Sequence, residues 1–180
     1  MANDRDKALI IVNTGNGKGK TTAALGMVFR TLGYGKKVTV IQFAKGSFQT
    51  GERLFSEKID NLNWLCAKVE HGRWVKNNSP ESNLRLGVFV LDEAFKAIEA
   101  EAKPALLVLD EFCFGLAERL IDFSRLAELL QRCREKRIDV VLTGRGAPPE
   151  LIELADTVTV MREVKHAYQS GIPARRGIDF

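Results

Sequence analysis

The sequence predicts an α/β fold, with a mainly parallel central sheet of about six strands flanked by helices. Apolar runs of strand length alternate with helical periodicity along most of the 180 residues. Several of these runs lack polar positions, which is typical of strands that are buried on both faces. The six predicted strands are residues 8–13, 37–43, 63–69, 105–110, 138–143 and 157–161.

Three apolar stripes with helical spacing lie between these strands, and we expect all three to face the core. Gly33 follows the first stripe and is expected to cap that helix. The stripes are Leu25, Val28, Phe29 and Leu32; Leu84, Val88, Leu91, Phe95 and Ile98; and Leu126, Leu129, Leu130 and Cys133. No repeat or linker divides the chain, so residues 1–180 are expected to form one domain. Residues 70–82 show no periodicity and are a candidate functional loop.

The composition favours a cytoplasmic globular protein. The first residues are polar, and no apolar stretch is long enough for a signal peptide or a membrane span. Cys66, Cys113 and Cys133 are odd in number and lack C-x-x-C spacing, so we expect small core residues instead of disulfides or zinc ligands. The only histidines, His71 and His166, are too few for a multi-histidine metal site. A net charge of +4 favours anionic ligands.

Residues 14–21, Thr-Gly-Asn-Gly-Lys-Gly-Lys-Thr, indicate a phosphate-binding loop between the first strand and a helix that begins near Lys20. Glycines at alternate positions allow the backbone N–H groups to turn toward phosphate, and the helix start adds positive potential. Lys20 is placed to reach the outer phosphates, and the Thr21 hydroxyl to bind Mg²⁺. Thr14 replaces the leading glycine of the common motif, which predicts a tighter loop.

Two further strand exits carry charged residues. The strand at 105–110 ends in Asp110 and Glu111, the pattern of a Walker B element, and ligands collect at this edge of parallel sheets. One carboxylate is expected to bind Mg²⁺ and the other to orient it, while a helix-capping role is the alternative. Arg145, between two glycines after residues 138–143, is a candidate phosphate contact, or else part of an ordinary turn. Arg30 is a further candidate for a contact with the nucleotide, and a surface salt bridge is the alternative.

Taken together, the motifs resemble the ATP:corrinoid adenosyltransferases, specifically the cob(I)yrinic acid a,c-diamide adenosyltransferase family. The resemblance extends from Ile10 to Phe180. The residues that carry it are 14–22, Gln42-Phe43-x-Lys45-Gly46, 109–111, 143–146, 155–158, 164–168 and the Gly-Ile-Asp-Phe at 177–180.

The resemblance implies a RecA-like P-loop fold, a homodimer, and transfer of the 5′-deoxyadenosyl group of MgATP to the cobalt of a reduced corrinoid. Triphosphate is released, and a reductase supplies the electrons. The family seats ATP in its loop in the reverse sense, which suits the missing leading glycine. The corrinoid that this chain prefers, a biosynthetic intermediate or complete cobalamin, is left open.

Roles for individual residues follow from the same resemblance. Lys18, Lys20 and Glu111 would stabilise the departing triphosphate, and Thr21, Glu111 and Asp110 are the candidate metal ligands. Arg73 and Trp74 would contact the corrinoid, although the Phe that family members often carry before this Trp is absent. The implied nucleotide-binding residues are Gly15, Asn16, Gly17, Lys18, Gly19, Lys20, Thr21, Thr22, Arg30 and Arg145.

The residues leave two other functions open. One is a RecA-like ATPase switch that binds nucleic acid through the basic run at residues 132–137. The other is a small-molecule kinase, which needs a base for the acceptor hydroxyl and an arginine-rich lid. The motif set favours the adenosyltransferase, with no nucleic-acid or membrane partner.

Overall fold

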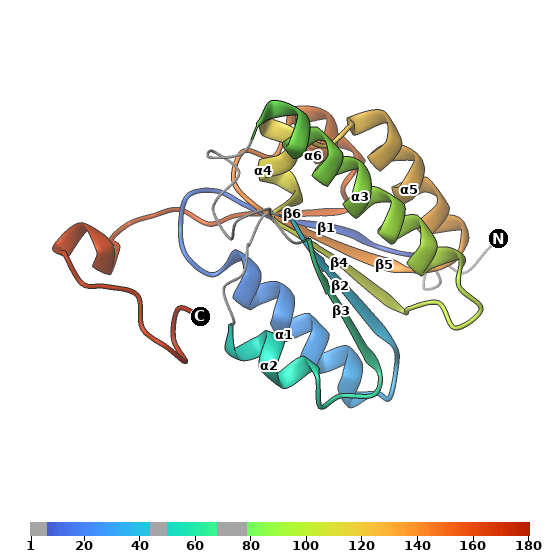
Figure 1. Ribbon diagram of the computed structural model, residues 1–180, viewed down its shortest axis with the longest axis horizontal. Helices are drawn as coiled ribbons and strands as arrows, with labels where there is room; N and C mark the ends of the chain where they lie inside the picture. Colours follow the sequence, from blue (N-terminus) through green and yellow to red (C-terminus); the bar gives the residue numbers. More distant parts are fainter. Residues whose placement is uncertain (1–6, 44–49, 68–78) are drawn as a thin grey trace.

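The computed structural model describes residues 7–43, 50–67 and 79–180. Six parallel strands form one sheet in the order β3-β2-β4-β5-β1-β6 (Figure 1). Their bounds are β1 Ile10–Thr14, β2 Val38–Gln42, β3 Leu62–Cys66, β4 Leu106–Asp110, β5 Asp139–Thr143 and β6 Thr157–Val160. All six predicted strands are therefore confirmed, with their ends shifted. The third strand ends at Cys66, and its predicted end at residue 69 lies outside the described residues.

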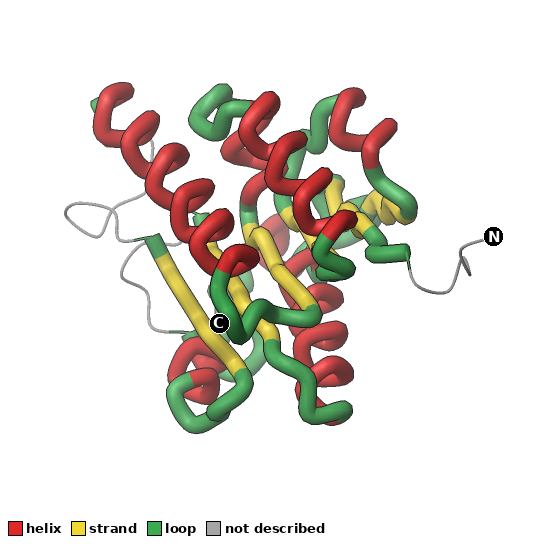
Figure 2. The backbone as a smooth tube through the Cα atoms, turned by 90° about the vertical axis from the view of Figure 1, so that its right-hand side faces the viewer, coloured by secondary structure: helices red, strands yellow, loops and turns green. Residues whose placement is uncertain are grey.

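Helices cover both faces of the sheet (Figures 1 and 2). One face carries α1 Lys20–Gly33 and α2 Gly51–Ser56, and the other carries α3 Pro80–Glu99, α4 Phe112–Ala117, α5 Phe123–Glu135 and α6 Pro149–Leu154. The chain after β6 runs away from the sheet, forms the 3₁₀ turn η4 Ala167–Ser170, and returns toward the start of α1 (Figure 1). Among these helices none combines the length and the apolar character that a bilayer crossing requires.

The strands are apolar on both sides because each side packs against its own helical layer. In β4, Leu107 and Leu109 join the core formed with α3, α4 and α5, whereas Leu106 and Val108 join the core formed with α1. Burial on alternate sides explains why no polar residue interrupts β4 until Asp110. The chain can turn polar only at the carboxyl ends, where the strands leave the two cores.

The prediction that the three apolar helical stripes face the core is only partly confirmed. The α5 stripe is buried as predicted. In α1, Val28 is buried, but Phe29 is 77% exposed. In α3, Leu91 and Ile98 are buried as predicted and Phe95 is partly buried, but Leu84 and Val88 are half exposed. The buried side of this helix also includes Leu86, Val90 and Ala94. These helices carry apolar residues on more than one side, so spacing alone does not identify the side that meets the sheet.

Two boundary predictions are also corrected. Gly33 is the last residue of α1, and the left-handed glycine that follows the helix is Gly35, with φ of 68°. Of the predicted loop at 70–82, residues 70–78 lie outside the described residues, and the last three residues belong to α3. This helix begins at Pro80 after the cap residue Ser79, whose hydroxyl accepts the Ser82 N–H.

Asp156 joins the edge strand β6 to its neighbours. Its carboxylate accepts hydrogen bonds from the Ile10 N–H at 2.8 Å and from Lys7 at 2.9 Å, and it forms an ion pair with Arg134 at 2.9 Å. Burial opposes the charged form, but these donors outweigh it and lower the pKa of Asp156 to about 2. Because β6 leads directly to Met161, this anchor also fixes the segment that lies against the phosphate-binding loop.

None of the three cysteines forms a disulfide. Cys113 and Cys133 are fully buried core residues, as predicted, and burial raises the pKa of each to about 12. Cys66 is only partly buried, so the prediction of a core residue is wrong at that position.

Candidate active site

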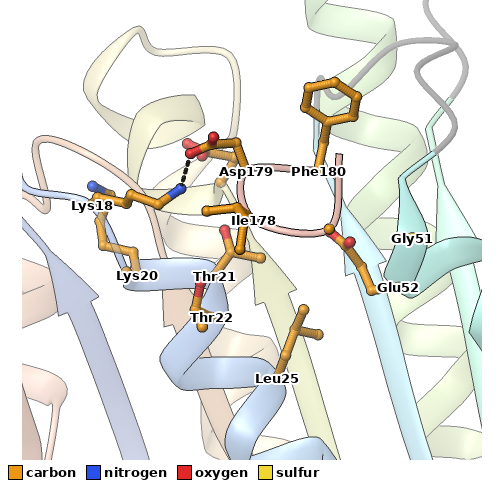
Figure 3. Close-up of a pocket in the computed structure, with 13 residues that line it drawn as sticks. Lys18, Lys20, Thr21, Thr22, Leu25, Gly51, Glu52, Ile178, Asp179 and Phe180 are labelled. Carbon is orange, nitrogen blue, oxygen red and sulfur yellow. Dashed lines mark hydrogen bonds and ion pairs between the residues drawn. The ribbon is translucent and has the colours of Figure 1, made fainter. Parts of the chain in front are cut away.

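A pocket of about 460 Å³ lies at the carboxyl edge of the sheet, above the start of α1 (Figure 3). The phosphate-binding loop and Glu111 form one part of its wall. Residues 177–180, at the C-terminal end of the chain, form another part. The lining residues are Lys18, Gly19, Lys20, Thr21, Thr22, Leu25, Gly51, Glu52, Glu111, Gly177, Ile178, Asp179 and Phe180. A second pocket shares Lys18, Ile178 and Asp179 with the first and also contains Arg145.

The backbone of the loop is shaped by the segment that follows β6. A Cβ atom at Gly15, where φ is 98°, would lie 2.5 Å from the Met161 carbonyl oxygen, and one at Gly17 would lie 2.8 Å from the Arg162 backbone. The Gly17 N–H donates to the Met161 carbonyl at 2.7 Å. The expectation that all the alternating glycines turn their N–H groups toward phosphate is therefore wrong for Gly17. Close backbone approach accounts for this glycine instead.

The start of α1 faces the pocket without a side-chain cap. Its N-cap residue is Gly19, with φ of 115°, and the first turn contains no acidic residue. The other two long helices, α3 and α5, are capped by Ser79 and Asp122. Because the first N–H groups of a helix need an acceptor, the uncapped start of α1 suits an anionic ligand. Thr21 and Thr22 line the pocket beside it.

Lys20 is a buried ammonium group beneath the loop. Only 9% of the residue is exposed, and its Nζ donates to the Gly17 carbonyl at 2.7 Å. Burial lowers the pKa of Lys20, with a further contribution from Arg145, while the nearby Glu111 and Asp110 carboxylates oppose the shift. Because water screens a buried charge only weakly, burial strengthens the attraction between the Lys20 ammonium group and an anion in the pocket.

Lys18 forms an ion pair with Asp179 across the mouth of the pocket (Figure 3). The other oxygen of Asp179 accepts the Arg175 N–H at 2.8 Å, and the hydrogen bonds from Lys18 and Arg175 lower the pKa of Asp179. No local pattern in the sequence indicates a role for Asp179, although it belongs to the last motif of the resemblance. A contact between residues 161 positions apart leaves no signal in local spacing.

The two carboxylates after β4 have different surroundings. Asp110 is 1% exposed, and its Oδ1 accepts the hydroxyls of Thr143 at 2.6 Å and Thr21 at 2.8 Å. Its Oδ2 accepts the Gln42 amide at 2.9 Å. Glu111 instead lines the pocket, from a left-handed backbone conformation with φ of 64°. This conformation costs a non-glycine residue about 1–3 kcal/mol, and the Thr143 hydroxyl supports it by accepting the Glu111 N–H.

The pocket could hold Mg²⁺ but not a metal bound by protein alone. In the parts of the chain described here, no group of three or more His, Cys, Asp and Glu side chains is close enough to do so. Mg²⁺ commonly takes one or two protein oxygens and completes its shell with phosphate and water. The Thr21 hydroxyl and the Glu111 carboxylate supply oxygens of this kind on the pocket wall.

The remaining predicted site residues are dispersed. Arg145 is exposed in the second pocket, whereas Arg30 lies in the last turn of α1 and lines neither pocket. At 1.5 Å per residue, Arg30 is about 15 Å along the helix from Lys20. Its predicted contact with the nucleotide therefore gains no support from the structure. Asn16 is exposed on the loop, and Arg73 and Trp74 lie outside the described residues.

The chain is similar to known corrinoid adenosyltransferases over nearly its whole length. Residues 6–180 match the model of the family described as ATP:corrinoid adenosyltransferase BtuR/CobO/CobP. A corrinoid adenosyltransferase from Sinorhizobium sp is 37% identical over 178 residues, which cover 97% of this chain and 81% of the relative. Those from Pseudomonas aeruginosa and Escherichia coli K12 are 37% and 38% identical, over 100% and 97% of this chain and 88% and 87% of their own lengths.

A family match over nearly the whole chain thus coincides with a pocket built from the phosphate-binding loop and the acidic strand exit. The chain belongs to the ATP:corrinoid adenosyltransferase family and is a transferase.

Proposed function

We propose that this enzyme transfers the 5′-deoxyadenosyl group of MgATP to the Co(I) centre of a reduced corrinoid and releases triphosphate. The electron pair of Co(I) forms the bond to C5′, and the C5′–O bond breaks with its electron pair going to the departing triphosphate. Co(I) is already a strong nucleophile, so the reaction needs alignment and leaving-group stabilisation instead of a general base.

The observation that supports this proposal most strongly is the convergence of positive charge on one pocket. Lys18, Lys20 and the uncapped start of α1 all meet there. They would bind the triphosphate portion and gain strength as the leaving group gathers charge. Removal of a single preorganised contact of this kind commonly costs about 10²–10³ in rate.

Mg²⁺ would be held by Thr21 and Glu111, and its charge would neutralise part of the triphosphate. Asp110 would act indirectly, because it is buried and accepts a hydrogen bond from the Thr21 hydroxyl. Arg73 and Trp74 would contact the corrinoid. We further propose that residues 1–180 act as one domain in a cytoplasmic homodimer, with a reductase supplying the electron that generates Co(I).

The nucleic-acid alternative is weakened by the partners of the basic run. Arg132 pairs with Glu128 and Glu99, Arg134 pairs with Asp156, and Lys136 pairs with Glu99. Charges already matched by carboxylates are poorly suited to replace the counterions of a phosphate backbone. We therefore favour small-molecule substrates.

Product analysis tests the proposal directly. ATP with a chemically reduced corrinoid should give a light-sensitive Co–C product and intact triphosphate. ATP labelled with ¹⁸O at the atom joining C5′ to the α-phosphorus should deliver that label to triphosphate. Lys20→Ala should abolish turnover as a site control. ADP as the nucleotide product, with the cobalt unalkylated, would reject the assignment.

A further inference from the structure

A chain of side-chain hydrogen bonds connects the edge strand β3 with the start of α1. The Trp64 indole N–H donates to the Gln42 carbonyl oxygen at 3.1 Å, and the Gln42 amide nitrogen donates to Asp110 Oδ2 at 2.9 Å. Asp110 Oδ1 then accepts the Thr21 hydroxyl at 2.8 Å. Four residues that are far apart in the sequence thus form one continuous network below the pocket.

Gln42 is the centre of this network, and its two neighbours allow its amide only one orientation. An indole N–H can only donate, and an ionised carboxylate can only accept, so the Gln42 oxygen must face Trp64 and its nitrogen must face Asp110. Gln42 is buried at the end of a strand whose other positions include the apolar Val38 and Val40. Burying an amide there is costly unless both of its ends are bonded, as they are here.

The consequence for the pocket lies in the Thr21 hydroxyl. Because Gln42 occupies Oδ2 of Asp110, the other oxygen of this carboxylate is turned toward Thr143 and Thr21. A hydroxyl that donates its hydrogen to Asp110 presents oxygen lone pairs toward a cation. The orientation of Asp110 therefore determines whether Thr21 is presented as a metal ligand.

We propose that Gln42, held by Trp64, is a positioning residue for the magnesium site: it orients Asp110 so that Thr21 offers its oxygen to the metal of MgATP. This inference rests on the proposed use of MgATP and assigns Gln42 and Trp64 no contact with either substrate. It predicts that the Gln42 side chain affects the metal-dependent part of nucleotide binding and leaves the metal-free part unchanged.

Calorimetric titration with ATP, in Mg²⁺ and in EDTA, separates these two parts without any corrinoid. Gln42→Met conserves length and removes both hydrogen bonds, and we expect it to weaken MgATP binding about tenfold, with metal-free ATP binding unchanged. Thr39→Val, on the same strand but outside the network, is the matched control and should change neither. An equal loss with and without Mg²⁺, or no loss at all, would overturn the proposal.

A double-mutant cycle tests the role of Trp64. Trp64→Phe keeps an aromatic ring but removes the N–H group, and it should weaken MgATP binding about two- to threefold in the parent protein. In the Gln42→Met background the same change should have no further effect, because the acceptor is already gone. Additive losses would show that Trp64 acts by packing alone. Thermal unfolding without ligand identifies any variant that fails to fold, in which case the other member of the pair carries the test.

Failure of this inference and failure of the proposed function are distinguishable. The titrations need only ATP and Mg²⁺, so a negative result leaves adenosyl transfer standing. Conversely, a wrong nucleotide product would reject adenosyl transfer even if the metal-dependent binding responds to Gln42 as expected.

Discussion

The ion pair between Lys18 and Asp179 predicts that the tail competes with the nucleotide. Asp179 neutralises Lys18 at the mouth of the pocket, and a triphosphate group would need the same ammonium group. Replacing Asp179 with Asn removes the competing charge but keeps an oxygen that can accept the Arg175 N–H. We therefore expect Asp179→Asn to bind ATP and inorganic triphosphate more tightly than the parent protein.

The expected size follows from the exposure of the pair. The Lys18 side chain is 47% exposed and that of Asp179 is 24% exposed, so solvent screens their attraction. A partly solvated pair of this kind contributes only a small net free energy. The removal of this competition corresponds to roughly two- to fivefold tighter binding.

Calorimetric titration with ATP and with inorganic triphosphate, each with Mg²⁺, measures the change. The gain should shrink when the ionic strength is raised from about 0.05 M to about 0.5 M, because salt screens charges near the surface. Asp60→Asn removes one negative charge at an exposed position just before β3 and is the control for net charge. Unchanged binding by Asp179→Asn would refute the reasoning. Weaker binding would also refute it and would show that Asp179 holds Lys18 in place for the nucleotide.

Three further predictions concern buried or bonded ionisable groups. Because burial lowers the pKa of Lys20, ATP affinity should fall as the pH rises through a range below that in which an ordinary lysine titrates. ATP titrations at several pH values check this. Lys20→Arg should remove the pH dependence of ATP affinity. Asp156→Asn should destabilise the protein by about 1–2 kcal/mol in urea unfolding at neutral pH. The pKa of Asp156 is about 2 in the folded protein against 3.8 for the free group. Its contribution to the free energy of unfolding is therefore complete above pH 3.8 and is lost as the pH falls through about 2. The difference in stability between the parent protein and the variant should vanish there. Iodoacetamide should modify Cys66 in the native protein but Cys113 and Cys133 only after unfolding, as peptide mass mapping with a denatured control would show.

Each of these has an outcome that would contradict it. A Lys20→Arg variant with the same pH dependence as the parent would place the titrating group elsewhere. An Asp156→Asn variant that loses stability equally at all pH values would implicate packing instead of charge. Rapid native labelling of Cys113 would show that the core beside Glu111 opens readily.

The strand pattern was predictable because strands buried on both faces leave a simple signature. The predicted run at 105–110 and β4 differ by one residue, since Leu106 to Leu109 must be apolar to fill two cores and Asp110 marks the carboxyl edge. The helices were less predictable. Val28 and Phe29 are adjacent apolar residues on α1, and only the position of the sheet decides which of them is buried.

The site divides in the same way. The loop, Lys20, Thr21 and the acidic pair could be recognised because phosphate and metal binding require those residue types in that order. The different environments of Asp110 and Glu111 were not predictable, because they depend on a left-handed turn at Glu111 and on donors from β2, β5 and α1.

The amino-acid sequence by itself determined the six strands, the phosphate-binding loop and the family, since these depend on local periodicity and on short motifs in a set order. Only the tertiary structure decided that Asp179 meets Lys18, that Gln42 joins Trp64 to Asp110, and that Glu111 and not Asp110 reaches the pocket. The physical reason is that these contacts join residues tens to more than a hundred positions apart, and strand order and backbone turns, not spacing along the chain, bring them within hydrogen-bonding distance.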